Sequence, residues 1–315
     1  MKKYWLIVWA SIMLFASVLH ARDRNLNIVF IPKSSDQVFW TFMRDGVEKG
    51  IRESGDVSLT WRGPSYNDDT DAQIQILKTY TKAGVDAIII APTDRVRLAQ
   101  PLREAAAAGI KIIVVDSGVD GSQYQNFVTT DNYAGGKLAA KQMAELLNGH
   151  GSVVVLRTVA GSASTDDRAN GFIDYLKANA PKINVVADEY GGGSRGKAQR
   201  SAALLLKKPI AFDGVFAVNE SATDGMLRAL REAGVAKQKR FVGFDSTDFL
   251  LEGLKRQEID GLVVQNPRQM GYLSLKAAVA AAHNEPLKDK TLFTDTTLVT
   301  RSNASSPEIQ KLLVP

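Results

Sequence analysis

The 315-residue sequence contains no cysteine and only three histidines. Without cysteine there are no disulfides to stabilise a fold in an oxidising compartment, so the apolar core alone must stabilise it. There is also no acceptor for the thioether lipid that anchors many exported bacterial lipoproteins. A zinc site or a nucleophilic triad is not expected either, since the histidines are scattered at His20, His150 and His283.

Two of the histidines remain after the first 21 residues are set aside. His150 adjoins a glycine-rich turn and His283 lies at the end of a predicted helix, so we interpret both as turn residues rather than general bases. The sequence therefore predicts a protein that is not an enzyme. It predicts no catalytic residue, no metal ion and no cofactor.

The chain also lacks a concentrated stretch of basic charge. It has 39 lysines and arginines against 34 acidic residues, a formal net charge of +5, and the basic residues are spread along the predicted helices. This distribution argues against nucleic acid as a partner. With 45% hydrophobic and 23% charged residues, the composition is that of a soluble globular protein, and the length suffices for two domains.

The first residues have a composition of their own. Lys2 and Lys3 precede an apolar run over 4–19, and small residues lie near its end. This order predicts a secretory signal peptide over 1–21, cleaved after Ala21. The alternative is an uncleaved membrane anchor, but the run is slightly short for spanning the hydrocarbon of a bilayer. With no lipid acceptor, the mature chain is expected to be freely soluble in the periplasm.

Apolar runs of strand length alternate with helical segments along the rest of the chain. This alternation predicts an α/β fold with parallel sheets covered by helices. The expected strands cover 25–31, 57–61, 86–90, 111–115, 152–156, 183–188, 213–217, 240–244, 261–264 and 292–299. The expected helices cover 38–53, 68–83, 95–108, 133–148, 165–179, 195–207, 220–233 and 268–284, with a short helix between 244 and 261.

The alternating pattern restarts near 126–133, which divides it into two series. We therefore predict two doubly wound, Rossmann-like parallel-sheet lobes joined by a multi-strand hinge, with a cleft between them. The hinge is expected near 129–131 and 265–267. The expected lobes are 22–129 plus 267–290 for the N-terminal lobe, and 130–266 plus 291–315 for the C-terminal lobe.

Polar and aromatic side chains stand at the ends of several predicted strands, where ligands bind in open α/β sheets. Carboxylates, amides and a guanidinium donate and accept hydrogen bonds in fixed planes, and aromatic rings cover the apolar face of a sugar. Such a set suits a neutral polyhydroxylated ligand, because each buried hydroxyl needs a partner. The residues concerned are Gln37, Phe39, Trp40, Asp116, Arg168, Asn219, Asp245 and Gln265.

Four of these residues have a structural alternative. Asn219 immediately precedes the helix predicted over 220–233 and is also a suitable N-cap for it. Phe39 and Trp40 are also candidates for the apolar core. Arg168 is also a candidate for a surface ion pair.

A glycine-rich segment over 191–196 matches the GxGxxG pattern of dinucleotide-binding sites. It follows a predicted strand, and Asp213 lies at about the spacing of a ribose-binding acid. However, the segment lies in the middle of its series rather than at the start, and Asp188 and Glu189 before it would repel a pyrophosphate. We interpret the segment as a flexible loop at the edge of the cleft.

The chain contains eight short motifs in the following order: DQVFW (36–40), APTD (91–94), VD (115–116), TDNYAGG (130–136), DRANGF (167–172), VNE (218–220), VGFD (242–245) and VQNP (264–267). In this order they resemble the periplasmic sugar-binding proteins of the ribose/galactose type, which are type I periplasmic binding proteins. Those proteins share their fold with the ligand domain of LacI-type repressors. The resemblance covers essentially the whole mature chain. It implies that the two aromatic residues stack on a sugar, while Asp116, Arg168, Asn219, Asp245 and Gln265 hydrogen-bond its hydroxyls.

Three positions depart from the ribose-binding pattern. Gln37 stands where an asparagine is usual, and Ser117 stands where ribose binders carry an arginine. Gly192 or Gly193 replaces an aromatic residue. The loss of one guanidinium and one ring argues against D-ribose itself and leaves a roomier pocket.

Two cations lie at the ends of the first two predicted strands, Lys33 and Arg62. Either side chain is long enough to fill part of the additional space. We include Lys33 among the expected ligand-binding residues.

The resemblance implies a monomeric solute receptor that closes around a monosaccharide or polyol and docks on an ABC-type permease in the inner membrane. The main alternative is a sensory receptor for a sugar or furanose-like signal, partnering a membrane kinase or chemoreceptor. A LacI-type repressor would need a DNA-binding helix-turn-helix at its start, where this chain has the predicted leader. A periplasmic enzyme would need catalytic groups that the sequence does not provide.

Overall fold

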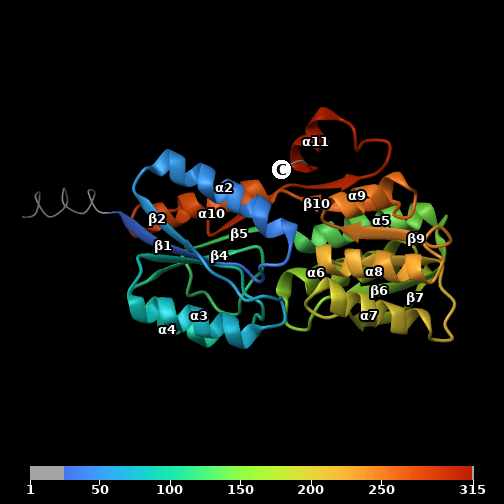
Figure 1. Cartoon of the computed structure of the whole chain (residues 1–315), viewed down its shortest axis with the longest axis horizontal. Coiled ribbons are helices and arrows are strands. Elements are labelled where there is room, and N and C mark those ends of the chain that lie inside the picture. Colours follow the sequence, from blue (N-terminus) through green and yellow to red (C-terminus); the bar gives the residue numbers. More distant parts are fainter. Residues whose placement is uncertain (1–24, 314–315) are drawn as a thin grey trace, which may run out of the picture.

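The computed structural model describes residues 25–313, in which the apolar runs form two six-stranded sheets (Figure 1). Each sheet is the centre of one α/β lobe, and the lobes lie side by side. The predicted α/β fold with two parallel-sheet lobes is therefore confirmed. The predicted signal peptide over 1–21 lies outside the described residues. Within 25–313, no helix combines the length and the hydrophobicity needed to cross a membrane.

The first lobe is built on a fully parallel sheet with the strand order β11-β5-β4-β3-β1-β2. Helices α2 and α10 cover one face of this sheet, and α3 and α4 cover the other. Central strands such as β3 are apolar at every position because both faces are buried. The bounds are β1 (Leu26–Ile31), α2 (Val38–Ser54), β2 (Val57–Trp61), α3 (Thr70–Ala83), β3 (Ala87–Ile90), α4 (Ala99–Ala107), β4 (Lys111–Val115), β5 (Asn126–Thr130), α10 (Pro267–Ala282) and β11 (Thr291–Thr294).

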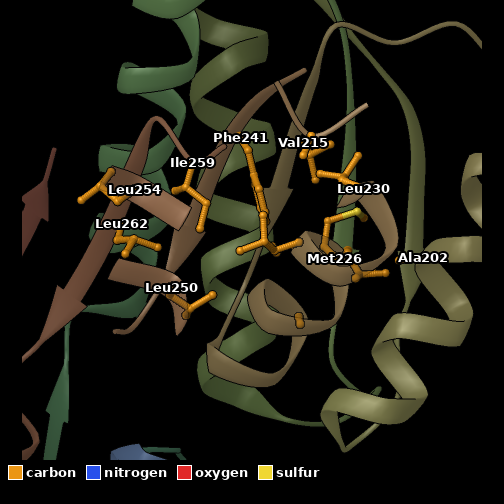
Figure 2. Close-up of a cluster of buried hydrophobic side chains, with 14 of the residues drawn as sticks. Ala202, Val215, Met226, Leu230, Phe241, Leu250, Leu254, Ile259 and Leu262 are labelled. Carbon is orange, nitrogen blue, oxygen red and sulfur yellow. The ribbon is translucent and has the colours of Figure 1, made fainter. Parts of the chain in front are cut away.

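The second lobe has the strand order β12-β10-β9-β8-β6-β7, in which only β12 runs antiparallel to its neighbour. Helices α5 and α6 cover one face, while α7, α8 and α9 cover the other, where Phe241, Met226 and Leu262 belong to one buried cluster (Figure 2). The bounds are α5 (Asn132–Leu146), β6 (His150–Arg157), α6 (Ala163–Asn179), β7 (Lys182–Tyr190), α7 (Arg195–Leu206), β8 (Gly214–Ala217), α8 (Glu220–Glu232), β9 (Arg240–Phe244), α9 (Asp248–Lys255), β10 (Gly261–Gln265), β12 (Thr296–Val299) and α11 (Pro307–Leu313).

The last strand region differs from the sequence prediction. The pattern predicts one strand over 292–299, but the structure contains two strands, β11 and β12, in different sheets. β11 pairs with β5 in the first sheet, although the prediction places everything from residue 291 onward in the C-terminal lobe. The strand-forming pattern runs on through Thr296, and Asp295 alone marks the point where the chain changes sheets. A single polar residue is too weak a signal for such a crossing.

Between residues 25 and 313 the chain passes between the lobes three times: after β5, after β10 and between β11 and β12. The first two crossings lie where the hinge is expected. The restart of the sequence pattern near 126–133 corresponds to β5, a strand of the first sheet followed at once by a helix of the second lobe. The hydroxyl of Thr130 donates to Oε1 of Gln265 at 2.9 Å, so these two crossings are hydrogen-bonded to each other.

Candidate functional site

All nine residues predicted to bind a ligand line one cavity between the lobes. The space between its walls, open solvent included, is about 340 Å³. The predicted residues are Lys33, Gln37, Phe39, Trp40, Asp116, Arg168, Asn219, Asp245 and Gln265. The cavity is also lined by Asn67, Thr158, Ser162, Ser164 and Thr165, which the sequence prediction did not include.

Asp116 and Asp245 occupy equivalent positions in the two lobes. Each follows a strand, β4 or β9, and each donates its backbone N–H to the neighbouring strand, at Val128 and Val263 respectively. Both residues have a positive φ, 62° and 66°, a left-handed conformation that aspartate tolerates better than most residues. This turn directs each side chain to the strand end, so the two carboxyl groups face the same cavity from opposite lobes.

The Asp245 carboxylate is held by groups of its own lobe. Its Oδ1 accepts a hydrogen bond from Nε2 of Gln265 at 2.6 Å, and its Oδ2 accepts one from the backbone N–H of Glu220 at 2.9 Å. The Arg168 guanidinium lies 4.0 Å from the same Oδ2. Burial raises the pKa of Asp245, and the charge of Arg168 opposes this shift. The carboxylate is thus fixed in one orientation at the cavity wall.

Arg168 is buried, with 2% of its surface exposed, so the alternative of a surface ion pair is wrong. Its Nε donates to Oδ1 of Asn132 at 2.8 Å and its Nη1 to the carbonyl of Val218 at 3.0 Å. The guanidinium also lies over the ring of Phe244, at 3.9 Å. None of these bonds uses Nη2. Burial lowers the pKa of this guanidinium, and Asp245 opposes the shift.

Two glycines bring α5 and α6 together and thereby place Arg168. A Cβ on Gly136 of α5 would overlap the carbonyl of Arg168 on α6, and a Cβ on Gly171 of α6 would overlap the carbonyl of Tyr133 on α5. The helices can therefore approach closely only because neither residue has a side chain. This approach carries Arg168 to Asn132, which lies at the start of α5.

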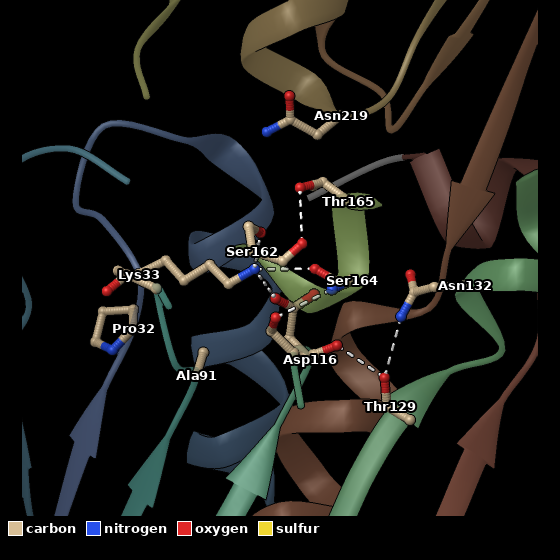
Figure 3. Close-up of polar contacts among 12 residues, drawn as sticks. Pro32, Lys33, Ala91, Asp116, Thr129, Asn132, Ser162, Ser164, Thr165 and Asn219 are labelled. Carbon is tan, nitrogen blue, oxygen red and sulfur yellow. Dashed lines mark hydrogen bonds and ion pairs between the residues drawn. The ribbon is translucent and has the colours of Figure 1, made fainter. Parts of the chain in front are cut away.

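Lys33 belongs to the first lobe but bonds mainly to the second (Figure 3). Its ammonium donates to the hydroxyl of Ser162 at 3.1 Å and to that of Ser164 at 2.9 Å, and it lies 3.3 Å from Oδ2 of Asp116. An ammonium has three donors, and these contacts use all of them. Burial lowers the pKa of Lys33, and Asp116 opposes the shift. Lys33 therefore connects the lobes at the cavity wall.

Phe39 and Trp40 are both core residues and cavity residues. They are 7% and 4% exposed and belong to the buried cluster of the first lobe, as the structural alternative states. Their rings meet edge to face, with centroids 5.0 Å apart and an interplanar angle of 87°. Both also line the cavity. The two interpretations of these residues are therefore compatible.

Asn219 is both a helix cap and a cavity residue, the two roles considered for it in the sequence. It is the N-cap of α8, with its Oδ1 accepting a hydrogen bond from the backbone N–H of Ala222 at 3.1 Å. Its side-chain amide donates to the hydroxyl of Ser221 at 3.2 Å. The capping alternative is confirmed, and the cap stands at the cavity wall.

Buried polar atoms without a partner concentrate at this cavity. Within the described residues, eight buried side-chain polar atoms have no hydrogen-bond partner. Four of them belong to residues that line the cavity: Nε2 of Gln37, Nε1 of Trp40, Oδ1 of Asn67 and Oγ1 of Thr158. Buried polar groups are almost always paired, and an unpaired one costs free energy. This mixture of donors and acceptors suits a ligand that carries several hydroxyl groups.

The glycine-rich loop meets the first lobe at the edge of the cavity. The carbonyl of Gly193 accepts a hydrogen bond from the backbone N–H of Asn67 at 3.1 Å. The Gly193 N–H donates to the carboxylate of Asp68 at 3.3 Å, which also pairs with Lys197 at 2.5 Å. The position of the segment 191–196 thus agrees with its interpretation as a loop at the edge of the cleft. Arg62 is not among the residues that line the cavity.

The serine and threonine residues at the cavity carry a sequence signal that the prediction did not use. Thr158 directly follows β6, and Ser162 is the N-cap position of α6. Both therefore lie in a connection that follows a strand, as Asp116 and Asp245 do. Short hydroxyl residues at a loop are common for reasons of turn formation, which conceals such a role.

Residues 28–286 match the family model described as periplasmic binding protein domain. The D-ribose/D-allose-binding protein of Pseudomonas aeruginosa is 28% identical, over 90% of this chain and 92% of its own length. The putative rhizopine-binding protein of Rhizobium meliloti is also 28% identical, over 96% of this chain and 97% of its own length.

Two solved structures share the fold over nearly their whole length. A carbohydrate transporter solute binding protein from Agrobacterium radiobacter, in complex with D-arabinose, has a TM-score of 0.88 and 33% identity, covering 92% of this chain and 99% of that one. The periplasmic component of an ABC-type sugar transport system from Hahella chejuensis has a TM-score of 0.84 and 36% identity, covering 87% and 100%. The two relatives are named as binding proteins and the two solved structures as components of transport systems, and none of the four is named as an enzyme.

Proposed function

Because the chain belongs to the periplasmic binding protein family, we propose that it is a periplasmic receptor that captures a monosaccharide or polyol between its lobes. The observation that carries this proposal is the set of four unpaired buried polar atoms at one cavity, on Gln37, Trp40, Asn67 and Thr158. Hydroxyl groups donate and accept, so a polyhydroxylated ligand is able to pair with all four.

The charges at the cavity favour an uncharged ligand. Two basic residues, Lys33 and Arg168, are matched by two acidic residues, Asp116 and Asp245. The Lys33 ammonium lies 3.3 Å from Asp116, and the Arg168 guanidinium lies 4.0 Å from Asp245. A charged ligand would leave one member of a buried pair without its counterion, which is costly. A sugar alcohol or a neutral sugar avoids that cost.

The proposed mechanism is a population shift towards the closed arrangement of the lobes. Cavity residues come from both sheets, so a ligand makes its full set of contacts only when the lobes are together. The three crossings of the chain between the lobes would then act as the hinge. The lobe division of the sequence prediction is retained in this proposal, with β11 added to the first lobe.

We further propose that residues 1–21 direct export of the protein and are then cleaved off. The mature protein is proposed to work as a monomer without a lipid anchor. It is proposed to deliver its ligand to an ABC-type permease of the inner membrane. Family membership supports the periplasmic location. Two of the similar solved structures are described as components of sugar or carbohydrate transport systems, which supports the permease as the partner.

Calorimetry and thermal shift of purified residues 22–315 test the proposed function. The panel comprises D-ribose, D-allose, D-arabinose, D-fucose, xylitol and myo-inositol, which are named with proteins similar to this one. We expect at least one to bind with micromolar affinity, about −8 kcal/mol, and to make the protein more compact in small-angle scattering. Binding of none of the panel, with no compaction, would contradict the proposal.

Substitution of Trp40 by phenylalanine tests the contact of one unpaired atom. Trp40→Phe keeps an aromatic ring at the cavity but removes the unpaired indole N–H. We expect the affinity for the bound sugar to fall by about 1 kcal/mol, roughly fivefold, the typical net value of a hydrogen bond. Trp61→Phe is the control, since Trp61 stacks on Phe30 at 4.0 Å and does not line the cavity. Equal affinities for both variants would show that the indole N–H does not meet the sugar.

A further inference from the structure

Helix α2 begins without a cap from its own lobe. Its N-cap residue, Gln37, makes no side-chain hydrogen bond to the helix, and its first turn contains no acidic residue. The first N–H groups of any helix lack a partner within the helix, and α2 begins at a buried position. The side chains of Phe39 and Trp40, in this first turn, line the cavity.

The missing cap comes from the second lobe. The carboxylate of Glu220, the first residue of α8, accepts hydrogen bonds from the backbone N–H groups of Val38 at 3.1 Å and Phe39 at 2.9 Å. Glu220 is completely buried. Arg195, at the start of α7, donates to the same carboxylate at 3.1 Å and to the carbonyl of Asp36 at 3.3 Å.

These contacts exist only when the lobes are together. Glu220 and Arg195 belong to the second lobe, whereas the two N–H groups and the carbonyl of Asp36 belong to the first. Separation of the lobes would leave two α2 N–H groups without their acceptor and would return the carboxylate to water. We propose that Glu220, supported by Arg195, is an inter-lobe latch that caps α2 on closure and so positions its aromatic residues at the ligand. This inference rests on the proposed ligand-driven closure.

Closure is also expected to be linked to a proton at Glu220. Burial raises the pKa of this carboxyl to about 7, although the hydrogen bonds from α2 and the charge of Arg195 lower it. The other charged group that acts on it is Asp245, after β9, which raises the pKa. In the open state, exposure to water should return the pKa towards its ordinary value of 4.5.

The direction of the pH effect on closure follows from this difference in the pKa of Glu220. A carboxyl with the higher pKa in the closed state takes up a proton on closing, between about pH 4.5 and 7. Closure is therefore favoured at the lower end of this window, and this contribution is lost as the pH rises through it. We therefore expect the affinity for sugar to fall as the pH is raised from about 4.5 to 7.

Glu220→Ala is compared with Asp224→Ala, a matched control on the same helix. Asp224 is also buried, but its carboxylate pairs with Arg228 of the same helix at 2.5 Å and not with the first lobe. For Glu220→Ala we expect about tenfold weaker binding of D-arabinose, or of the panel sugar with the largest thermal shift. We also expect about tenfold faster hydrogen exchange at the start of α2. Asp224→Ala should lower the unfolding temperature and leave both quantities unchanged.

Equal sugar affinity and equal amide exchange in Glu220→Ala and wild type would overturn the latch. Glu220→Gln provides a second measurement, because it keeps one acceptor oxygen and removes the titration. Its sugar affinity should change less between pH 5 and 7.5 than that of wild type, and parallel profiles would overturn the proton linkage. If no panel sugar binds, the proposed function fails, while faster exchange at the start of α2 in sugar-free Glu220→Ala than in sugar-free wild type would still show that Glu220 caps α2 whenever the lobes meet.

Discussion

Arg168→Ala is expected to lower the affinity for the bound sugar by at least about 100-fold. Truncating one partner of a buried, hydrogen-bonded charge pair costs about 2–5 kcal/mol, and 100-fold corresponds to roughly 2.7 kcal/mol within that range. The substitution leaves Asp245 at the cavity wall without its cation, and it leaves Asn132 without its donor. It also removes Nη2, the guanidinium nitrogen that donates no hydrogen bond to the described residues. Calorimetry with the panel sugars measures the loss.

Arg157→Ala is the matched control for this variant. Arg157 is a buried arginine of the same lobe, bonded to Asp188 at 2.6 Å and near Asp166, and it does not line the cavity. Both variants should lower the denaturant midpoint, since each leaves a carboxylate without its cation. Only Arg168→Ala should lose sugar binding in the folded protein. An Arg168→Ala variant that binds as well as Arg157→Ala would show that the guanidinium supports the fold alone.

The fold could be predicted because each of its signals is local. The all-apolar run of β3 and the polar residues that follow each strand are visible in a few neighbouring residues. The division of β11 from β12 could not be predicted, since it depends on which distant strand each one pairs with. Neither partner, β5 or β10, is near in sequence.

The site was predictable where the strand ends carry distinctive residues. Asp116 and Asp245 are placed by the position of their strands, and both enter the cavity. The arrangement of Lys33 was not predictable, because its hydroxyl partners are 129 and 131 residues away and lie in the other lobe. The same holds for Glu220, whose α2 partners are 182 and 181 residues away. Contacts between lobes depend on how the two lobes are placed against each other, which local patterns do not encode.

Several contacts join residues that are far apart in the sequence and hold the two lobes together. Lys33 reaches Ser162 and Ser164, and the backbone N–H of Arg95 donates to the carbonyl of Gly161 at 2.9 Å. At the edge of the cavity, the carbonyl of Gly193 accepts a hydrogen bond from the backbone N–H of Asn67, and the Gly193 N–H donates to the carboxylate of Asp68. Backbone groups meet there without an intervening side chain, so the separation of the lobes is set by the size of the residue at position 193.

Gly193→Ala is therefore expected to prevent full closure and to weaken sugar binding by about 10- to 100-fold. A Cβ at this position would lie 2.6 Å from Cγ of Asp68 and still closer to its backbone nitrogen, across the cleft. Overpacking of this kind costs about 1–3 kcal/mol, and here the lobes avoid it by staying apart. Each lobe alone remains unstrained, so the unfolding temperature without sugar should match that of wild type. Small-angle scattering with saturating sugar should show a less compact protein than wild type.

Gly196→Ala is the control from the same segment. A Cβ on Gly196, in the first turn of α7, would have Arg200 Nη1 as its nearest neighbour, at 3.7 Å, and would meet none of the described residues of the first lobe. Alanine favours a helix over glycine by about 1 kcal/mol, so this variant should be slightly more stable and bind sugar as wild type does. Wild-type affinity and wild-type compaction in Gly193→Ala would mean that the loop yields to the added methyl. The closed arrangement would then not depend on the close approach of Gly193 to Asp68.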